Sequence, residues 1–184
     1  MGITKPRIED FLPLVQRVER RLVGTSLFLS QAGKLEMVNS VLSALPTYYM
    51  CTLKLPPTVI KQIDKYRKHC LWKGADLNAK KPPLAAWKLV CRPKKEGGLG
   101  VIKLAAHNDA LLLKNLHKFY NKADIPWVHL IWNRYYVNGR LPDQRKIGSF
   151  WWRAIVKLSD MYKGLAVANV GDGSTIYLWH RGNS

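Results

Sequence analysis

The acidic residues of this 184-residue chain are few, and they form no paired-aspartate motif that could hold catalytic metal ions. A two-metal polymerase or nuclease needs paired carboxylates, and the twelve Asp and Glu residues form no D-x-D or D-D pair. The five His residues lack the H-E-x-x-H spacing of a zinc site, and no Ser sits in a nucleophile elbow. We therefore predict that the isolated chain is not an enzyme and binds no metal or other cofactor.

The string GGLG at residues 97–100 is the remaining candidate for phosphate chemistry. It lacks the G-x-x-x-x-G-K-[ST] form of a nucleotide-binding loop, which favours a tight turn with positive φ angles. Arg92, Lys94 and Lys95 precede the string, so backbone amides and cationic side chains are expected to converge there. The pattern predicts a contact with phosphate rather than a pocket for a small-molecule substrate.

Net charge restricts the function more than any other property of the composition. The chain has 30 Lys and Arg against 12 Asp and Glu, a net charge of +18, and such self-repulsion indicates a polyanionic partner. Nucleic acid is the first candidate and an anionic membrane surface the second. Residues 61–103 alone carry twelve basic and three acidic side chains. A solvated face is the alternative, but this concentration favours a surface that follows phosphates.

Within that stretch, the clearest pattern lies on a helix predicted at residues 56–72, which a pair of prolines opens. At about 100° per residue, one side of this helix is apolar and carries Val59, Ile63, Tyr66 and Cys70. The opposite side carries three lysines, which are free to face phosphates. With the irregular residues that follow, the predicted nucleic-acid-binding set is Lys61, Lys65, Lys68, Lys73, Lys80, Lys81, Lys88, Arg92, Lys94 and Lys95.

Tryptophans stand next to basic residues at three places, Trp72-Lys73, Trp87-Lys88 and Trp152-Arg153. Stacking on bases is one use of such side chains. Core packing is the favoured role for most of them, with one or two left exposed enough to stack.

Cysteine spacing and hydropathy favour an intracellular protein, nuclear or cytoplasmic. Cys51, Cys70 and Cys91 form no C-x-x-C pair and, being three, no disulfide framework. We expect them to be small core residues rather than metal ligands. No apolar run approaches the roughly 18 residues of a membrane span, and the N-terminus has no apolar signal region, so no membrane association is predicted.

The hydrophobic periodicity predicts a mainly α fold with one β-hairpin. Apolar residues recur at helical spacing in six segments, near residues 8–22, 30–45, 56–72, 104–120, 126–136 and 149–164. Ser30 and Ser149 are expected to cap the second and the last of these helices. Residues 73–103 are predicted to be irregular but partly fixed to a core, through Trp87, Leu89, Val90, Leu99 and Val101. Asp172-Gly173 between two β-prone runs predicts the hairpin at residues 167–179.

Three groups of segments resemble the region that follows the palm in plant LINE-type non-LTR retrotransposon polyproteins. The first group is 29–35 (LSQAGKL), 38–42 (VNSVL) and the Leu45-Pro46 pair. The second, which is the most specific, starts with Leu55-Pro56 and contains 87–94 (WKLVCRPK) and 97–100 (GGLG). The third is 148–152 (GSFWW), 170–173 (VGDG) and Trp179-His180. The resemblance spans residues 13–180.

The resemblance implies a helical thumb-like segment at residues 1–72 and a basic loop with a helical connector at 73–148. Residues 149–184 would be a helix and hairpin that begin the next module. In the family, the palm with its aspartates precedes this region, and a zinc-binding and often an RNase H domain follow it. The family often has Asp after the final Trp-His, where this chain has Arg181. We therefore expect a fragment of an RNA-directed DNA polymerase without the catalytic core.

Two functional hypotheses follow. In the first, the chain binds RNA and DNA without sequence preference and holds template–primer or target through phosphates. In the second, it is a transposon-derived relic with neither binding nor catalytic function. A salt titration of binding separates them, whereas RNA versus DNA preference and oligomeric state are left open.

Overall fold

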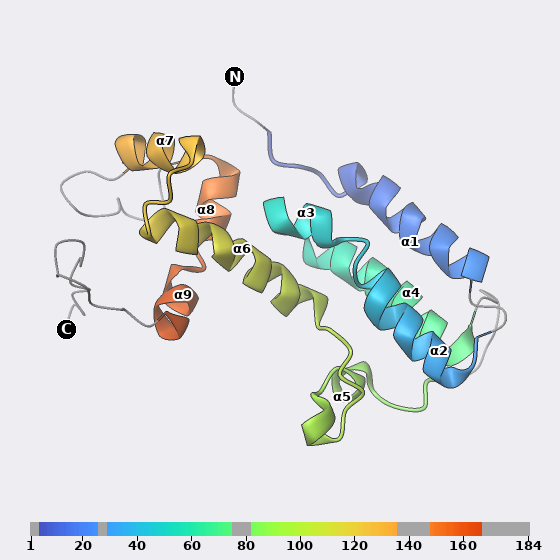
Figure 1. The fold of residues 1–184 in the computed structure, drawn as a ribbon. Helices are drawn as coiled ribbons and strands as arrows, with labels where there is room; N and C mark the ends of the chain where they lie inside the picture. Colours follow the sequence, from blue (N-terminus) through green and yellow to red (C-terminus); the bar gives the residue numbers. More distant parts are fainter. Residues whose placement is uncertain (1–3, 26–28, 75–81, 136–147, 167–184) are drawn as a thin grey trace. The chain divides into compact units, whose positions relative to one another are not determined.

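The computed structural model describes residues 4–25, 29–74, 82–135 and 148–166, and these are mainly helical, as predicted (Figure 1). The chain divides into two compact units, residues 1–112 and 113–184, with the division inside α6 (Leu104–Tyr120). The predicted functional boundaries at residues 72 and 148 stay predictions. Besides the first half of α6, the first unit contains η1 (Glu9–Phe11), α1 (Leu12–Thr25), α2 (Gln31–Glu36), η2 (Met37–Leu42), α3 (Thr47–Thr52), α4 (Pro57–Lys73), α5 (Trp87–Val90) and η3 (Lys94–Glu96).

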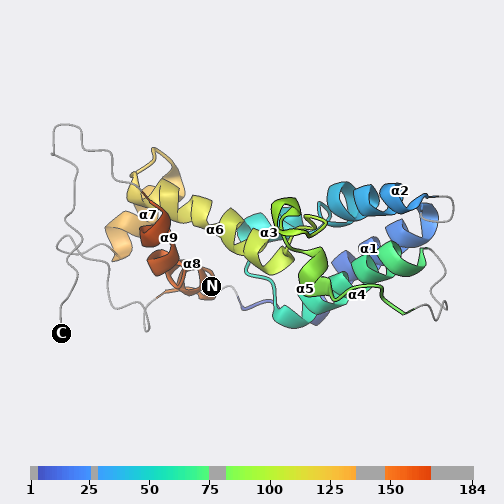
Figure 2. The ribbon, with the colours of Figure 1, turned by 90° about the horizontal axis from the view of Figure 1, so that it is seen from below.

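Helices α1, α2 and α4 lie side by side in the first unit (Figures 1 and 2). Helical spacing in the sequence predicts that Ile8, Phe11, Leu12, Val15, Val18 and Leu22 share one buried face, but Ile8 and Leu12 are 42% and 45% exposed. Leu12 lies about 100° from Phe11 around the helix axis, and Ile8 precedes the 3-10 turn η1, which changes the helical phase. The predicted residues that do reach the core from this segment are Phe11, Val15, Val18 and Leu22.

The second predicted helix begins as expected and then changes its winding. The Ser30 hydroxyl accepts a hydrogen bond from the Gly33 N–H at 3.2 Å, which caps α2. After Glu36 the chain forms the π-helix η2, and the Ser43 N–H reaches back five residues to the Val38 carbonyl. Pro46 does not end the helical region, because it is the N-cap of α3, a helix that the sequence analysis missed.

Helix α4 agrees with its prediction in both bounds and burial. Pro57 occupies its first turn, where a proline costs no hydrogen bond. Val59, Ile63 and Cys70 are fully buried and Tyr66 partly so. Ile60, Leu71 and Arg67 are also buried although they were not predicted, and Arg67 is a charged residue with no exposed surface.

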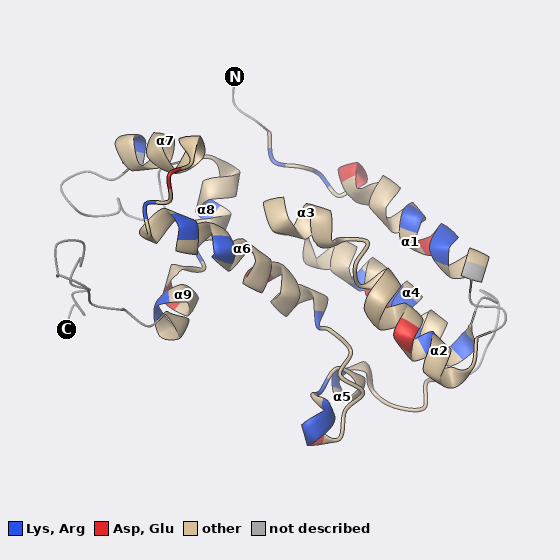
Figure 3. Ribbon diagram, viewed as in Figure 1, with Lys and Arg blue, Asp and Glu red and all other residues tan. Residues whose placement is uncertain are grey.

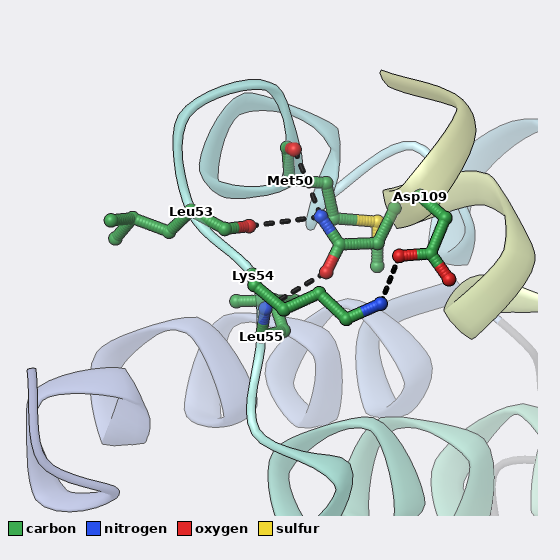
Figure 4. Close-up of polar contacts among 6 residues, drawn as sticks. Met50, Leu53, Lys54, Leu55 and Asp109 are labelled. Carbon is green, nitrogen blue, oxygen red and sulfur yellow. Dashed lines mark hydrogen bonds and ion pairs between the residues drawn. The ribbon is translucent and has the colours of Figure 1, made fainter. Parts of the chain in front are cut away.

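The loop between α3 and α4 is fixed by one buried side chain of α6. Asn108 donates from Nδ2 to the carbonyls of Met50 and Leu53, each at 2.9 Å, and its Oδ1 accepts from the Leu55 N–H at 2.8 Å (Figure 4). Next to it, Lys54 and Asp109 form an ion pair. Because the loop leads directly into α4, Asn108 determines where that helix starts.

The second unit packs around aromatic rings. It contains the second half of α6, α7 (Pro126–Tyr135), α8 (Phe150–Val156) and α9 (Ser159–Leu165). Phe119 is fully buried, stacked on Trp132 with ring centroids 5.1 Å apart and edge-on to Trp152 at 5.0 Å. The Ser149 hydroxyl accepts from the Trp152 N–H, which confirms the predicted cap of α8.

Two predictions for this unit are wrong. The apolar residues expected to pack from α7 were Trp127, Leu130 and Ile131. Ile131 is buried, but Leu130 is 68% exposed, and Val128 is the other buried residue of this helix. The last predicted helix is divided into α8 and α9 by a turn at Leu158, whose side chain is buried. The predicted hairpin at 167–179 lies outside the described residues. Among those described, no helix is both long and apolar enough to cross a membrane.

Candidate nucleic-acid interface

Three of the predicted cations form a row on α4, and we call Lys61, Lys65 and Lys68 the α4 cluster. All three are exposed, opposite the buried stripe, as the periodicity predicted. Asp64 is the one acidic residue of α4, and its carboxylate is bound to Arg67 rather than to a lysine of the cluster. Figure 3 shows the basic positions along α4 and on the turn around α5. The α4 cluster therefore keeps its positive charge at the surface.

The other predicted residues fall into two groups. Lys73, at the end of α4, is partly buried, and Lys88 on α5 is exposed. Lys80 and Lys81 lie outside the described residues. Arg92, Lys94 and Lys95 are all exposed, and we call them the turn cluster. Among the described carboxylates, none forms an ion pair with a residue of the turn cluster.

The turn cluster stands on a closed turn at residues 90–101. The Val90 carbonyl accepts from both the Leu99 and Val101 N–H groups, at 3.1 and 3.4 Å. The Arg92 carbonyl accepts from the Gly100 N–H at 2.9 Å. Gly97 has a φ of +77°, and a side chain at Gly98 would place its Cβ 2.1 Å from the Arg92 carbonyl oxygen. The expected tight glycine turn with positive φ is confirmed.

The N–H groups of the glycine string itself are not available to a phosphate. The N–H groups of residues 96–101 all donate hydrogen bonds to carbonyls of the same turn, which leaves none of them for an anion. Leu89 and Leu99, predicted to be fixed to the core, are 44% and 37% exposed, whereas Val90 and Val101 are buried. The predicted phosphate contact therefore stays a prediction for the residues that precede the string, Arg92, Lys94 and Lys95.

Trp87 lies beside two cations of α4, one of which belongs to the α4 cluster. The Lys68 ammonium lies 5.6 Å from the centre of the Trp87 ring and the Arg67 guanidinium 5.4 Å from it, both within cation–π range. Trp72 and Trp87 pack against the core and Trp152 is buried, so core packing is confirmed for all three. Lys68 is exposed, as predicted, and its ammonium also lies over the indole.

Two thiols are buried in these regions, Cys70 on α4 and Cys91 in the turn. Burial raises the pKa of the Cys70 thiol to about 11. Burial also raises the pKa of Cys91, and the cations of Arg67, Lys103 and Lys68 oppose that rise. Lys103 is exposed and shares this positive environment, yet it was absent from the predicted set because it stands three residues beyond the glycine string. Cys51 is exposed, so the prediction that all three cysteines are core residues is wrong for this one.

Arg67 is the feature of the site that the sequence analysis missed. Its guanidinium donates to Asp64 Oδ1 at 2.6 Å, to Ser43 Oγ at 2.9 Å and to the Ile102 carbonyl at 2.8 Å. Burial lowers its pKa, and the charge of Asp64 opposes that shift. Arg67 Nε has no hydrogen-bond partner. Helical spacing gave no reason to single out Arg67, because an arginine in a basic stretch ordinarily faces water.

Elsewhere in the described residues there is no group of three or more His, Cys, Asp or Glu side chains that could hold a metal ion. The described part thus offers cations, aromatic rings and a closed turn. In other proteins, groups of these kinds contact phosphates and stack on bases.

Comparison with known proteins gives two plant relatives. The chain is 33% identical to the "Putative ribonuclease H protein" of Arabidopsis thaliana over 97% of its own length and 30% of that protein's length. It is 26% identical to an "Uncharacterized mitochondrial protein" of the same plant over 74% of its own length and 90% of that protein's. No family model and no solved structure matches. The chain is thus related in sequence to plant proteins, and it spans less than a third of the one named for ribonuclease H.

Proposed function

We propose that this chain is a non-catalytic, nucleic-acid-binding fragment of a retrotransposon-derived RNA-directed DNA polymerase. It binds RNA or DNA through phosphates, without sequence preference, and so holds template–primer or target. The observation that carries the proposal is the surface made by the α4 cluster and the turn cluster. Six exposed cations lie there, and the carboxylate of Asp64 is occupied by Arg67.

The relatives support a retroelement origin. The first of them is named for a nuclease that acts on nucleic acid and is more than three times as long as the stretch aligned. A position inside such a longer protein agrees with a chain that resembles the region between a palm and an RNase H domain. We propose accordingly that the chain, by itself, has no polymerase or nuclease activity. Metal-dependent nucleotide incorporation by the pure protein would contradict this.

The decisive experiment is a binding titration on duplex DNA and single-stranded RNA from low to moderate salt. If about six cations contact phosphates, the slope of log K against log salt is near −5 for duplex DNA. Replacing Lys61, Lys65 and Lys68 with Gln flattens that slope by roughly three units if all three make contact. The fold survives, because none of the three side chains is buried.

A control of equal charge change comes from the second unit, where Lys114, Lys118 and Lys157 are also exposed. Replacing these with Gln leaves the slope within one unit of the wild type if the site, rather than net charge, is responsible. Circular dichroism confirms folding of each variant. An unchanged slope in the folded Lys61/Lys65/Lys68 variant removes α4 from the interface. A wild-type chain that does not bind even at low salt supports the relic hypothesis.

A further inference from the structure

We propose that Arg67 is a positioning residue for nucleic-acid binding: it holds the turn cluster and the α4 cluster in one fixed arrangement without touching the ligand itself. This inference rests on the proposed function. Arg67 has no exposed surface, so it cannot contact a phosphate. Its effect on binding must therefore pass through the groups to which it is bonded.

Two elements of the helical core hold the Arg67 guanidinium. It belongs to α4, one residue before Lys68, and Asp64 one helical turn earlier holds its guanidinium. The Ser43 hydroxyl accepts a second hydrogen bond, and Ser43 is presented by the end of the π-helix η2. The head group is thus fixed to two elements of the helical core before it meets the basic turn.

The anchored guanidinium also contacts both ends of segment 87–102. At one end of segment 87–102 it lies 5.4 Å from the centre of the Trp87 ring, and at the other end it donates to the Ile102 carbonyl at 2.8 Å. Between these ends, the turn is closed by hydrogen bonds to the carbonyls of Val90 and Arg92. One side chain therefore ties both ends of a self-contained turn to α4, and the turn carries Arg92, Lys94 and Lys95.

The three acceptors around this side chain require an arginine. A guanidinium is a planar fork with five N–H donors, so it reaches Asp64, Ser43 and Ile102 at once while lying near an indole. An ammonium group has three donors on one nitrogen and lacks the planar fork. A lysine at this site keeps the charge but cannot span the same set of partners.

The consequence concerns how the two clusters act on one polyanion. Clusters held in fixed relative position bind a single phosphate backbone together, with the advantage in affinity of linked sites. If the turn is released, the α4 cluster still binds, but the turn cluster no longer contributes reliably. Arg67→Lys should therefore flatten the salt slope by about as much as removing the turn cluster, although it removes no charge.

The test uses the full chain and a duplex DNA of random sequence in a double-mutant design. The first variant is R67K, the second carries R92Q, K94Q and K95Q, and the third combines all four. We expect R67K and the turn-cluster variant each to flatten the slope by roughly two to three units, with at least tenfold weaker binding at low salt. We expect the combined variant to match the turn-cluster variant. Fully additive effects, or no effect of R67K, overturn the inference.

The two buried thiols supply a measurement that does not depend on binding. In a Cys51→Ser background, Cys91 reports the turn and Cys70 reports α4. R67K should raise the rate at which a thiol reagent labels Cys91 at least tenfold and leave the rate for Cys70 unchanged. Equal acceleration of both thiols means that R67K loosens the whole unit, and this also overturns the inference.

Leu22→Ala is the control for general destabilisation, since Leu22 is fully buried and belongs to α1, away from segment 87–102 in the chain. It should lower stability without changing the salt slope. If R67K does not fold, as judged by circular dichroism, Ser43→Ala takes its place and is expected to show the same pattern at smaller size. A wild type that fails to bind contradicts the proposed function instead, and the labelling result then still decides whether Arg67 holds the turn.

Discussion

Helix α4 and segment 87–102 both present cations, but they position them by different means. On α4, helical periodicity places Lys61, Lys65 and Lys68 opposite a buried stripe, and the positions follow from local spacing alone. In the segment, the cations depend on carbonyls of Val90 and Arg92 that accept hydrogen bonds from residues up to eleven positions later. Basic residues that are close in sequence therefore differ in how firmly the fold holds them at the surface.

Each region also has its own buried polar anchor. Asn108 fixes the start of α4 with three hydrogen bonds from a neutral amide. Arg67 fixes the segment with a buried charge whose Nε lacks a partner. Burial of a charge costs free energy that its partners offset only in part. We therefore expect the segment to open more readily than the start of α4.

The largest expected effect comes from the anchor of α4. Asn108→Ala leaves the Leu55 N–H and two carbonyls without partners in the interior, and it should lower the free energy of unfolding by about 3 kcal/mol. Urea denaturation measures this. Asn133→Ala, at an exposed position of α7, is the control and should change stability by less than about 0.5 kcal/mol. Equal losses would show that Asn108 is no anchor.

The next largest effect concerns the turn. Gly98→Ala places a Cβ 2.1 Å from the Arg92 carbonyl oxygen, a backbone atom that can move only if the turn distorts. We expect a loss of about 2–3 kcal/mol. Gly97→Ala meets no atom within 4 Å and only introduces a side chain at a φ of +77°, which costs about 1 kcal/mol. Thermal unfolding of the two variants should rank them in this order, and the reverse order contradicts the close approach.

A third prediction compares the thiols at high pH. The Cys70 thiol has its pKa raised from 9.0 to about 11, so the unfolded chain releases this proton first. The contribution of this thiol to the free energy of unfolding is fully present below pH 9. It is lost as pH rises to about 11, at up to about 1.4 kcal/mol per pH unit. Cys70→Ala should flatten the decline of stability over this range.

Cys91→Ala serves as the comparison. Three cations oppose the rise in the pKa of this thiol, so its removal should flatten the decline less than Cys70→Ala does. Equal flattening by both substitutions would mean that Arg67, Lys103 and Lys68 do not oppose the rise in the pKa of Cys91.

These differences explain what could be predicted from the sequence. Helices α4 and α6 and the caps at Ser30 and Ser149 follow from local rules, namely periodicity and N-terminal capping, and all were predicted. The π-helix η2 and the short α3 were not predicted. They depend on a five-residue hydrogen bond to Val38 and on a proline that starts a helix rather than ending one.

The same division holds for the candidate site. Exposure of the α4 cluster followed from spacing, and exposure of the turn cluster from its composition. That the amides of the glycine turn are occupied could not be inferred, because their acceptors depend on how the turn closes. The role of Arg67 was equally hidden, since its partners Ser43 and Ile102 are 24 and 35 residues away.

The smallest expected effect tests whether the two regions interact at the surface as well as in the interior. Lys68 lies over the Trp87 ring, 5.6 Å from its centre, and an exposed cation–π contact contributes about 0.5 kcal/mol. A double-mutant cycle with Lys68→Gln and Trp87→Leu should give a coupling of that size in the free energy of unfolding.

Lys61 is the matched residue for this cycle, because it stands on the same face of α4 and makes no cation–π contact with Trp87 in the described residues. Its cycle with Trp87 should give zero coupling within error. Equal coupling for both lysines would mean that Trp87 acts through α4 as a whole. Coupling confined to Lys68 would show that the indole joins one lysine of the α4 cluster to the segment, so that the surface contact adds to the buried one made by Arg67.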